Sequence, residues 1–324
     1  MKRRKIAVLR GGPSSEHEVS LKTGRSVIDT LKDDHDILDV VIDKQGKWFV
    51  NGIEKKPTEV VRLMDVVFNA MHGEYGEDGQ VQEILEILGV PFTGPKKLGA
   101  AISMNKQKTK DILKKAGIKT PNYKSYNLKS KDEVGEVSRK IFNSFSFPLV
   151  LKATSKGSSV GVYIVQNMEE LRDALCKLYQ ESPDFICEEY IKGKEGTVGV
   201  IDCFRGEDSY SLLPIEIVPP DSKQFFDYEC KYDGSTKEIC PGNFTKAESQ
   251  EMQRVAKLAH ELLGLRHYSR SDFMVHPKRG VFFLETNSLP GMTSESLLPK
   301  AVKAVGSTYK DFLEHVIDLA IDRK

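Results

Sequence analysis

The sequence predicts a multidomain protein of α/β and α+β class whose N-terminal domain contains a parallel sheet. The chain has 324 residues, which exceeds the usual size of one hydrophobic core. Apolar, β-rich runs at 6–9, 37–42 and 65–71 alternate with helical patterns, and this alternation is typical of parallel α/β units. Further helices and strands follow to the C-terminus. We therefore predict three domains, at 1–103, 104–193 and 194–324.

Charge and cysteine content exclude several classes of function. Lys and Arg number 48 against 47 Asp and Glu, a net charge of +1, so no overall field favours nucleic acid. No window approaches the apolar length of a membrane span. The five cysteines form no CxxC pair, which indicates reduced thiols. We expect a cytoplasmic protein with no membrane or nucleic-acid partner. The cysteines are Cys176, Cys187, Cys203, Cys230 and Cys240.

The first strand leads into a glycine turn and a helix. The run 6–9 precedes Gly11-Gly12, and Ser15 with Glu18 predicts a capping box for a helix that ends near Leu31. Backbone N–H groups at such a helix start favour an anion.

A second polar loop, His72-Gly-Glu-Tyr-Gly-Glu-Asp-Gly79, follows the strand-like run that ends at Met71. Open α/β sheets place ligand-binding loops there. The glycines match neither a dinucleotide fingerprint nor a P-loop. A glycine-rich turn with a hydrogen-bonded histidine is the alternative.

The segment Gly157-Ser-Ser-Val-Gly161 matches the GxSxG pattern of serine hydrolases. That elbow requires a helix after the serine, but 160–165 is β-branched and aromatic and predicts a strand. We therefore predict a hairpin between 147–152 and 160–165 whose tip closes over phosphates. The alternative is a hydrolase with Ser159 as nucleophile. Its histidine would be His260, His267, His276 or His315.

Three further segments complete the pattern. A charged helix is predicted at 106–115, with several lysines facing water. The segment 187–197 joins two predicted strands and suits a nucleotide, although alone it is only a polar linker. The long aromatic loop 224–234 is typical of an active-site lid, with Lys231 and Tyr232 as donors.

The most informative segment, 270–287, predicts a hairpin with a metal site. Apolar runs at 273–275 and 281–284 flank the turn-forming residues 276–280. A turn centred on Lys278-Arg279 sets Asp272 opposite Glu285, and residues two apart share a face.

Carboxylates so close together favour a cation between them. Oxygen donors from carboxylates and an amide suit Mg²⁺ or Mn²⁺. The alternative is a solvated hairpin end whose carboxylates pair with Arg270.

Five blocks in this order resemble the ATP-grasp superfamily, and within it the D-alanine–D-alanine ligases. The resemblance covers nearly the whole chain and implies an ATP-grasp fold. Three departures stand out, namely Ala153, Asn105 and Arg10, where the family commonly has proline, aspartate and an aliphatic residue. The matching blocks are 11–20, 72–79, 152 with 156–161, 227–232 and 270–296.

The resemblance also implies the nucleotide and metal contacts. Lys106 and Lys152 would contact ATP phosphates, residues 188–191 would surround the adenine and Glu195 would bind the ribose. Asp272, Glu285 and Asn287 would hold two Mg²⁺ (or Mn²⁺). The residues implied in ATP binding are Lys106, Lys152, Ser158, Glu188, Glu189, Ile191, Glu195 and Lys231.

For the amino-acid substrates, the resemblance implies that Glu16 binds the ammonium of the first D-alanine. Glu16, Ser158 and Tyr232 would form a hydrogen-bonded chain that holds the lids shut. His72 would lie near the first substrate, and Arg270 would stabilise the oxyanion. Gly291, Ser296 and Leu297 would position the second substrate.

The implied reaction joins two D-alanines through an acyl phosphate, in a homodimer that makes a peptidoglycan precursor. Mg²⁺, Lys231 and Arg270 would offset the charge of the transferred phosphoryl group. Tyr232 favours D-alanine as second substrate. A related ligase that takes D-lactate or D-serine as its second substrate is one alternative. A nucleotide-binding module without catalytic activity is another.

Overall fold

The N-terminal part of the chain is a sheet with a parallel centre. The structure, a computed structural model, describes residues 3–157, 161–220 and 236–322. The strands are β1 (Lys5–Gly11), β2 (Asp36–Ile42), β3 (Trp48–Val50), β4 (Ile53–Lys55) and β5 (Val66–Asn69). Their order is β4-β3-β2-β1-β5, and β1 pairs in parallel with both β2 and β5. The predicted parallel sheet is confirmed for these three strands.

The edge of this sheet is an antiparallel hairpin that the sequence prediction missed. β3 pairs with both β2 and β4 in antiparallel fashion. The turn is Asn51-Gly52, and both residues have positive φ, 50° and 76°. An Asn-Gly pair between apolar residues is the strongest short hairpin signal in a sequence, so this element was predictable.

Four helices belong to this region: α1 (His17–Leu31), α2 (Pro57–Val61), α3 (Gln80–Ile87) and α4 (Lys97–Met104). The predicted capping box of Ser15 and Glu18 is wrong, because α1 begins after Glu16 without a side-chain cap. Ser14 is the hydroxyl that organises this turn. It accepts a hydrogen bond from the Glu16 N–H and donates one to the His72 carbonyl. The glycine turn is thereby tied to the loop after β5.

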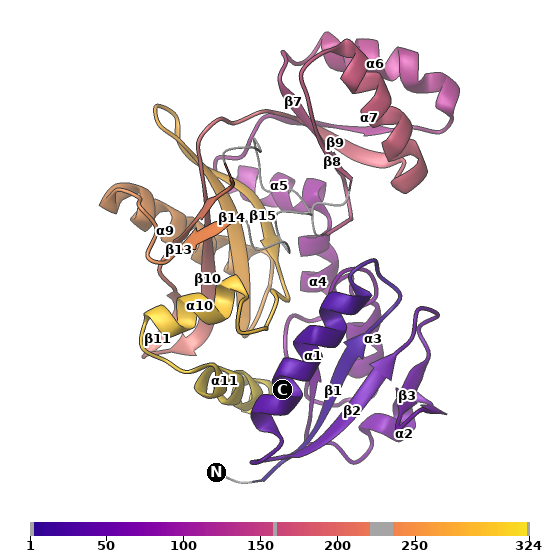
Figure 1. Cartoon of the computed structure of the whole chain (residues 1–324), viewed down its shortest axis with the longest axis vertical. Coiled ribbons are helices and arrows are strands. Elements are labelled where there is room, and N and C mark those ends of the chain that lie inside the picture. Colours follow the sequence, from indigo (N-terminus) through magenta and orange to yellow (C-terminus); the bar gives the residue numbers. More distant parts are fainter. Residues whose placement is uncertain (1–2, 158–160, 221–235, 323–324) are drawn as a thin grey trace.

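The central part is an antiparallel sheet covered by helices (Figure 1). Its strand order is β6-β9-β7-β8, and β7 and β8 form the predicted hairpin. A strand rather than a helix therefore follows the GxSxG segment. Its elements are β6 (Tyr123–Asn127), η1 (Lys131–Glu133), α6 (Val134–Phe142), β7 (Leu149–Ala153), β8 (Val162–Val165), α7 (Met168–Glu181) and β9 (Asp184–Glu189).

The C-terminal part is an antiparallel sheet of six strands, with three helices among its described residues. Its main path is β13-β12-β10-β14-β15, and β11 pairs with β10. The strands are β10 (Lys194–Phe204), β11 (Glu207–Ser211), β12 (Ile215–Val218), β13 (Lys237–Ile239), β14 (Tyr268–His276) and β15 (Gly280–Asn287). The helices are α9 (Lys246–Leu262), α10 (Leu297–Ala304) and α11 (Tyr309–Asp322).

Two hydrophobic cores join segments that are far apart in the sequence. Ile6 and Phe68 of the first sheet share a core with Tyr268 and with Phe312 of α11, which lies beside α1 in Figure 1. Helix α5 (Lys106–Lys115) contributes Leu113 to the core under the C-terminal sheet. The boundaries at 103/104 and 193/194 stay predictions.

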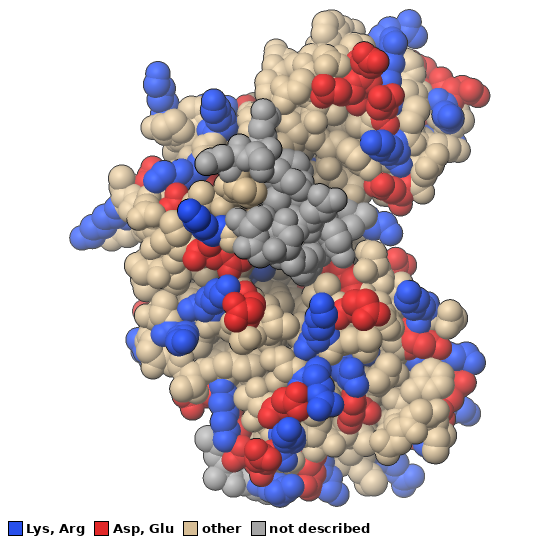
Figure 2. Space-filling view, in the orientation of Figure 1, with Lys and Arg blue, Asp and Glu red and all other residues tan. Residues whose placement is uncertain are grey.

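The surface carries both signs of charge. Figure 2 shows acidic and basic side chains interspersed over one face. Within the three described ranges, no helix has the length and apolar character needed to cross a membrane.

Candidate functional site

The hairpin of β14 and β15 places the predicted metal ligands together. Arg270 pairs with Asn287 and Asp272 with Glu285, as predicted. The predicted turn centre is wrong, because His276 pairs with Gly280 and the turn is centred on Lys278. A β-bulge between Asp272 and Phe273 shifts the pairing of the two strands by one residue, and this shift restores the pairing predicted for Asp272 and Arg270. The site therefore has the predicted pairing although the turn differs.

Asp272 lies at the centre of a hydrogen-bonded group. Arg270 donates to it twice, with Nε–Oδ1 and Nη2–Oδ2 distances of 3.0 Å each. Thr197 Oγ1 and Asn287 Nδ2 also donate to this carboxylate, at 2.5 and 3.0 Å. Burial alone would lower the pKa of the Arg270 guanidinium, but Asp272 raises it above its ordinary value. These contacts fix the carboxylate in one orientation.

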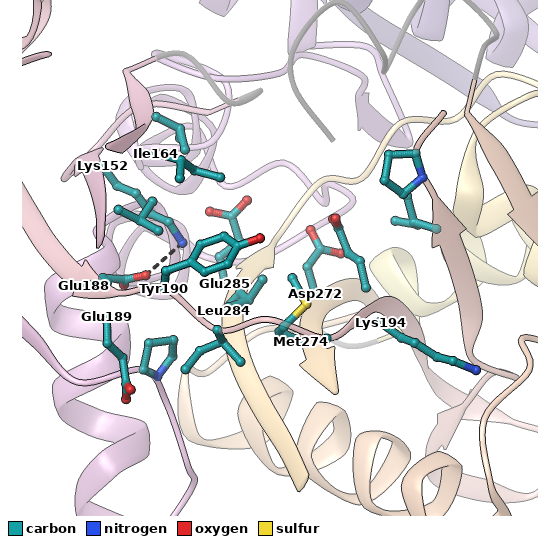
Figure 3. Close-up of a pocket in the computed structure, with 18 of the residues that line it drawn as sticks. Lys152, Ile164, Glu188, Glu189, Tyr190, Lys194, Asp272, Met274, Leu284 and Glu285 are labelled. Atoms are coloured by element: carbon teal, nitrogen blue, oxygen red, sulfur yellow. Dashed lines mark ion pairs between the residues drawn. The ribbon is translucent and has the colours of Figure 1, made fainter. Parts of the chain in front are cut away.

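The bulge also changes which side chains face the cavity beside the hairpin. Neighbouring residues of a regular strand point to opposite faces, yet Leu284 and Glu285 both line this cavity (Figure 3). An apolar wall and a carboxylate are thus side by side on β15.

The cavity has a volume of about 310 Å³ and lies between the central and C-terminal sheets. One part has apolar walls, which suits a flat ring. Lys106, Lys152, Arg270, Asp272 and Glu285 bring charge to the same cavity. The arrangement suits a ligand with an apolar end and an anionic end. The apolar residues are Val150, Val162, Ile164, Ile191, Met274 and Leu284.

The predicted adenine and ribose residues also reach this cavity. Glu188, Glu189, Ile191 and Glu195 all line it. The Glu188 side chain is only 1% exposed and pairs with lysines, whereas Glu189 forms a two-fold ion pair with Arg279 of the hairpin turn. Their contacts with a nucleotide stay predictions.

Lys110, which the sequence prediction did not single out, lies behind the two lysines predicted to contact phosphate. Lys106 Nζ lies 3.3 Å from Glu285, and Lys152 Nζ lies 2.9 Å from Glu188 Oε2. Lys110 Nζ lies 2.8 Å from Glu188 Oε1 and is fully buried. The prediction that several lysines of α5 face water is confirmed for Lys108, Lys114 and Lys115, whereas Lys106 and Lys110 are buried.

The charges in this group shift one another's pKa values. Burial alone would raise the pKa of Glu188, but Lys110 and Lys152 lower it. Burial lowers the pKa of Lys110 despite its contact with Glu188. For Lys152, Glu188 and Glu285 outweigh burial and raise the pKa.

A second, smaller cavity of about 40 Å³ adjoins the first and contains Glu16, Glu77 and Asn287 in its lining. Lys106, Leu284 and Glu285 line both cavities. The backbone passes very close to Glu16 at two glycines. A Cβ would lie 2.8 Å from Glu16 Oε2 at Gly73 and 2.7 Å from it at Gly157. Glycine therefore lets both loops approach this carboxylate.

His72 is buried and fixed by hydrogen bonds. Its Nδ1–H donates to the Leu289 carbonyl at 2.9 Å, so Nε2 accepts from Thr23 Oγ1 at 2.8 Å. Burial lowers the pKa of this imidazole. Its hydrogen bonds join the loop after β5 to the loop after β15.

Glu77 is a half-buried group that the sequence prediction missed, although it lies in the predicted loop. It accepts hydrogen bonds from the backbone N–H groups of Gly73 and Leu289, at 2.7 and 3.1 Å. Burial and then the nearby Glu16 raise its pKa to about 8. Two carboxyl groups in one site often divide into a charged and a protonated form.

Glu77 should make stability depend on pH. Its pKa is higher in the folded chain than when unfolded, so its contribution is complete below about pH 4.5 and is lost as pH rises through about 8. Glu77→Gln retains a neutral side chain but loses one of two backbone hydrogen bonds, because its amide NH₂ cannot accept. We expect the variant to be less stable than the native chain at pH 5, and this difference to shrink towards pH 9. Chemical denaturation at several pH values tests this, and a constant difference would contradict it.

The residues predicted for the second substrate lie between β15 and α10. A Cβ at Gly291 would lie 2.9 Å from Ser296 Oγ, and this hydroxyl also bonds Thr293. Leu297 begins α10 and lines the larger cavity.

Several residues named in the sequence predictions lie outside the described residues. The whole predicted lid loop 224–234 is among them, with its residues Lys231 and Tyr232. The others are Ser158 and Ser159.

The four histidines proposed for a hydrolase have other partners. His260 lies between Ser269 Oγ and Asp202 Oδ1, at 2.7 and 3.1 Å. This Ser–His–Asp order resembles a triad, but Ser269 and His260 are buried and neither is among the residues that line the two cavities. His267 accepts a hydrogen bond from the Gly94 N–H, and His276 accepts one from the Lys278 N–H of its own turn. His315 donates a hydrogen bond to the Asp202 carbonyl. The hydrolase alternative has no support in the described residues.

Comparison with known proteins identifies the family. The model for the D-ala D-ala ligase C-terminus matches residues 112–318, and that for the N-terminus matches residues 5–62 and 51–95. The chain belongs to the D-alanine–D-alanine ligase family. It is therefore a ligase, and the predicted ATP-grasp fold agrees with its structural neighbours.

Relatives cover essentially the whole chain. A D-alanine--D-alanine ligase of Aquifex aeolicus is 38% identical over 97% of this chain and 99% of its own length. One from Carboxydothermus hydrogenoformans is 35% identical over 98% of both. The D-alanine-D-alanine ligase structure from Coxiella burnetii has a TM-score of 0.83 at 25% identity and covers 100% of this chain and 95% of its own. The VanG D-Ala:D-Ser ligase of Enterococcus faecalis has a TM-score of 0.84 at 27% identity, over 98% and 100%.

Proposed function

We infer that this chain joins two D-alanines to form D-alanyl-D-alanine, with ATP converted to ADP and phosphate. The observation that carries this is the pair of adjoining cavities. The larger has apolar walls and cationic side chains, and the smaller contains the carboxyl groups of the buried Glu16 and the half-buried Glu77. Lys106 and Glu285 line both, so the phosphate end of a nucleotide would meet an amino acid there.

The reaction requires activation of a carboxylate, which is a poor electrophile. The carboxylate of the first D-alanine attacks the γ-phosphorus of ATP, and ADP leaves. The amine of the second D-alanine then attacks the acyl carbon, and phosphate leaves. Arg270, held by Asp272 in the lining of the larger cavity, would stabilise the negative charge that develops in both steps. The carboxylate of Glu16 suits the ammonium of the first substrate.

The donor set fits Mg²⁺ or Mn²⁺. Among the described residues, no group of three or more His, Cys, Asp or Glu is placed to hold a metal. A cation would therefore depend on Asp272, Glu285 and the amide oxygen of Asn287. Oxygen-only donors that leave room for phosphate oxygens are what Mg²⁺ prefers. Bound there, it would offset phosphate charge, and we propose two such ions.

Phosphate release tests the activity. With ATP, Mg²⁺ and D-alanine we expect one phosphate per dipeptide, and L-alanine serves as the matched control. Absence of phosphate would overturn the proposal. ATP binding without turnover would instead favour a nucleotide-binding module.

The second substrate is decided by its product. We propose D-alanine, with D-lactate and D-serine as the alternatives. Mass spectrometry of the products formed with all three present decides among them, and a depsipeptide or a D-alanyl-D-serine product as the main species would contradict the proposal.

Cellular context completes the proposal. We place the reaction in the cytoplasm, in the synthesis of peptidoglycan precursors, and in a homodimer. No nucleic-acid or membrane partner is expected. Analytical ultracentrifugation tests the dimer.

A further inference from the structure

Three charged side chains form a buried group behind the nucleotide cavity. Glu188 of β9 lies between Lys110 of α5 and Lys152 of β7. The Lys110 Nζ–Glu188 Oε1 distance is 2.8 Å, and the Lys152 Nζ–Glu188 Oε2 distance is 2.9 Å. The side chains of Lys110 and Glu188 are each 1% exposed and that of Lys152 is 11% exposed. Of the two lysines, only Lys152 lines the cavity (Figure 3).

We propose that Lys110 is a positioning residue for nucleotide binding, which holds one oxygen of Glu188 and so leaves the charge of Lys152 available to phosphates. The inference rests on the proposed function, because it requires ATP in the larger cavity. Lys110 acts through Glu188 and touches no substrate.

The charge count of the group supports this role. Two ammonium groups and one carboxylate leave a net charge of +1 beside the cavity. Without Lys110 the pair of Glu188 and Lys152 would be neutral. Both carboxylate oxygens could then turn to Lys152 and draw it away from an anionic ligand. In a buried site such a change is screened far less than at the surface.

The local structure explains how Lys110 reaches this position. Lys106 and Lys110 are one helical turn apart on α5, so they share a face. Asn105 caps the helix, since its side chain accepts from the Lys108 N–H at 2.9 Å. The Lys106 N–H donates to the Thr154 carbonyl beyond β7. One lysine thus lines the cavity and the next lies behind it, against the Tyr123 ring at 5.8 Å.

A purely structural role is the competing explanation. The pair of Lys110 and Glu188 also ties α5 to β9, and its loss could affect stability alone. The two roles differ in what restores nucleotide binding. If charge balance matters, removing the Glu188 charge as well should compensate for the loss of Lys110, whereas a packing role predicts no compensation.

The experiment compares Lys110→Met with the double variant Lys110→Met/Glu188→Gln. Glu188→Gln alone is the reference for the double variant, because Glu188 itself lines the cavity, and Lys108→Met is the matched control on the exposed face of α5. ATP binding is measured by calorimetry on the full chain with Mg²⁺, and KM is determined separately for ATP and D-alanine. Methionine has nearly the length of lysine, and Lys152 remains to pair with Glu188. Native chain that fails to bind ATP would overturn the proposed function itself.

We expect the Kd for ATP to rise about tenfold or more in Lys110→Met, or about 1.4 kcal/mol. The KM for D-alanine should stay unchanged. The double variant should bind ATP more tightly than Lys110→Met and with a Kd within about threefold of that of Glu188→Gln, and Lys108→Met should match the native chain. Native-like binding by Lys110→Met, or a double variant that binds no more tightly than Lys110→Met, would overturn the inference. If Lys110→Met does not fold, the double variant decides, and a Kd tenfold or more above that of Glu188→Gln would be the adverse result.

Discussion

Replacing Arg270 by methionine is expected to lower kcat/KM for D-alanine by about 10²–10³-fold, the usual effect of removing one preorganised donor from a developing oxyanion. Its guanidinium is held by two hydrogen bonds to Asp272, so it pays no reorganisation when charge develops. Thr197 and Asn287 still donate to Asp272 in the variant. The fold should therefore persist, and steady-state kinetics with a thermal melt measures both effects.

The control for this variant is an arginine of similar geometry on the surface. Arg254 also makes two hydrogen bonds to a carboxylate, that of Glu251, at 2.8 Å each, but its side chain is 57% exposed. Arg254→Met should leave activity unchanged. Arg270→Lys keeps the charge without the two-pronged geometry and should recover only part of the rate. Full activity in Arg270→Met would remove this residue from the mechanism.

The second large effect concerns stability. Asp202→Ala is expected to lower the free energy of unfolding by about 3 kcal/mol or more, because two buried donors lose their acceptor. These donors are His260 Nε2 and the His267 N–H, at 3.1 and 2.7 Å from the carboxylate. Denaturant unfolding measures the loss, and the thermal midpoint should fall by on the order of 5–10 °C.

Ser269→Ala is the companion variant. Ser269 bonds the other side of His260, so this change removes one hydrogen bond and should cost about 1 kcal/mol. Ligase activity should be retained below the midpoint in both variants. Loss of turnover in folded Ser269→Ala would show that the resemblance to a catalytic triad has functional meaning.

Local sequence patterns were enough to predict several parts of the site. The hairpin of β7 and β8 follows from β-branched residues on both sides of a small-residue tip. The predicted pairing of Asp272 with Glu285 is also present, although a bulge that the sequence prediction missed was needed to offset the wrong turn centre. The Asn51-Gly52 hairpin was equally readable and was overlooked. In each case the decisive contacts join residues close in the sequence, so that spacing limits the pairings to a few registers.

Lys110 and Glu77 were missed for a different reason. On a helix rich in lysine, a charged residue is expected to face water, and the partner that makes burial tolerable, Glu188, lies on a distant strand. Glu77 was read as part of a glycine-rich loop, yet its accepted hydrogen bond from Leu289 depends on how two sheets meet. The spacing of Lys106, Lys110 and the buried Leu113 on one helical face was the available signal.

The bulge in β15 separates the geometry of the hairpin turn from that of the end that carries Asp272 and Glu285. Between the bulge and the turn the residues pair around Lys278, and on the other side of the bulge they pair as if the turn were centred between Lys278 and Arg279. Deletion of one residue at the turn could therefore be offset by loss of the bulge, with Asp272 still opposite Glu285. The turn, which contacts Glu189 through Arg279, could thus be shortened without any shift of the two paired carboxylates.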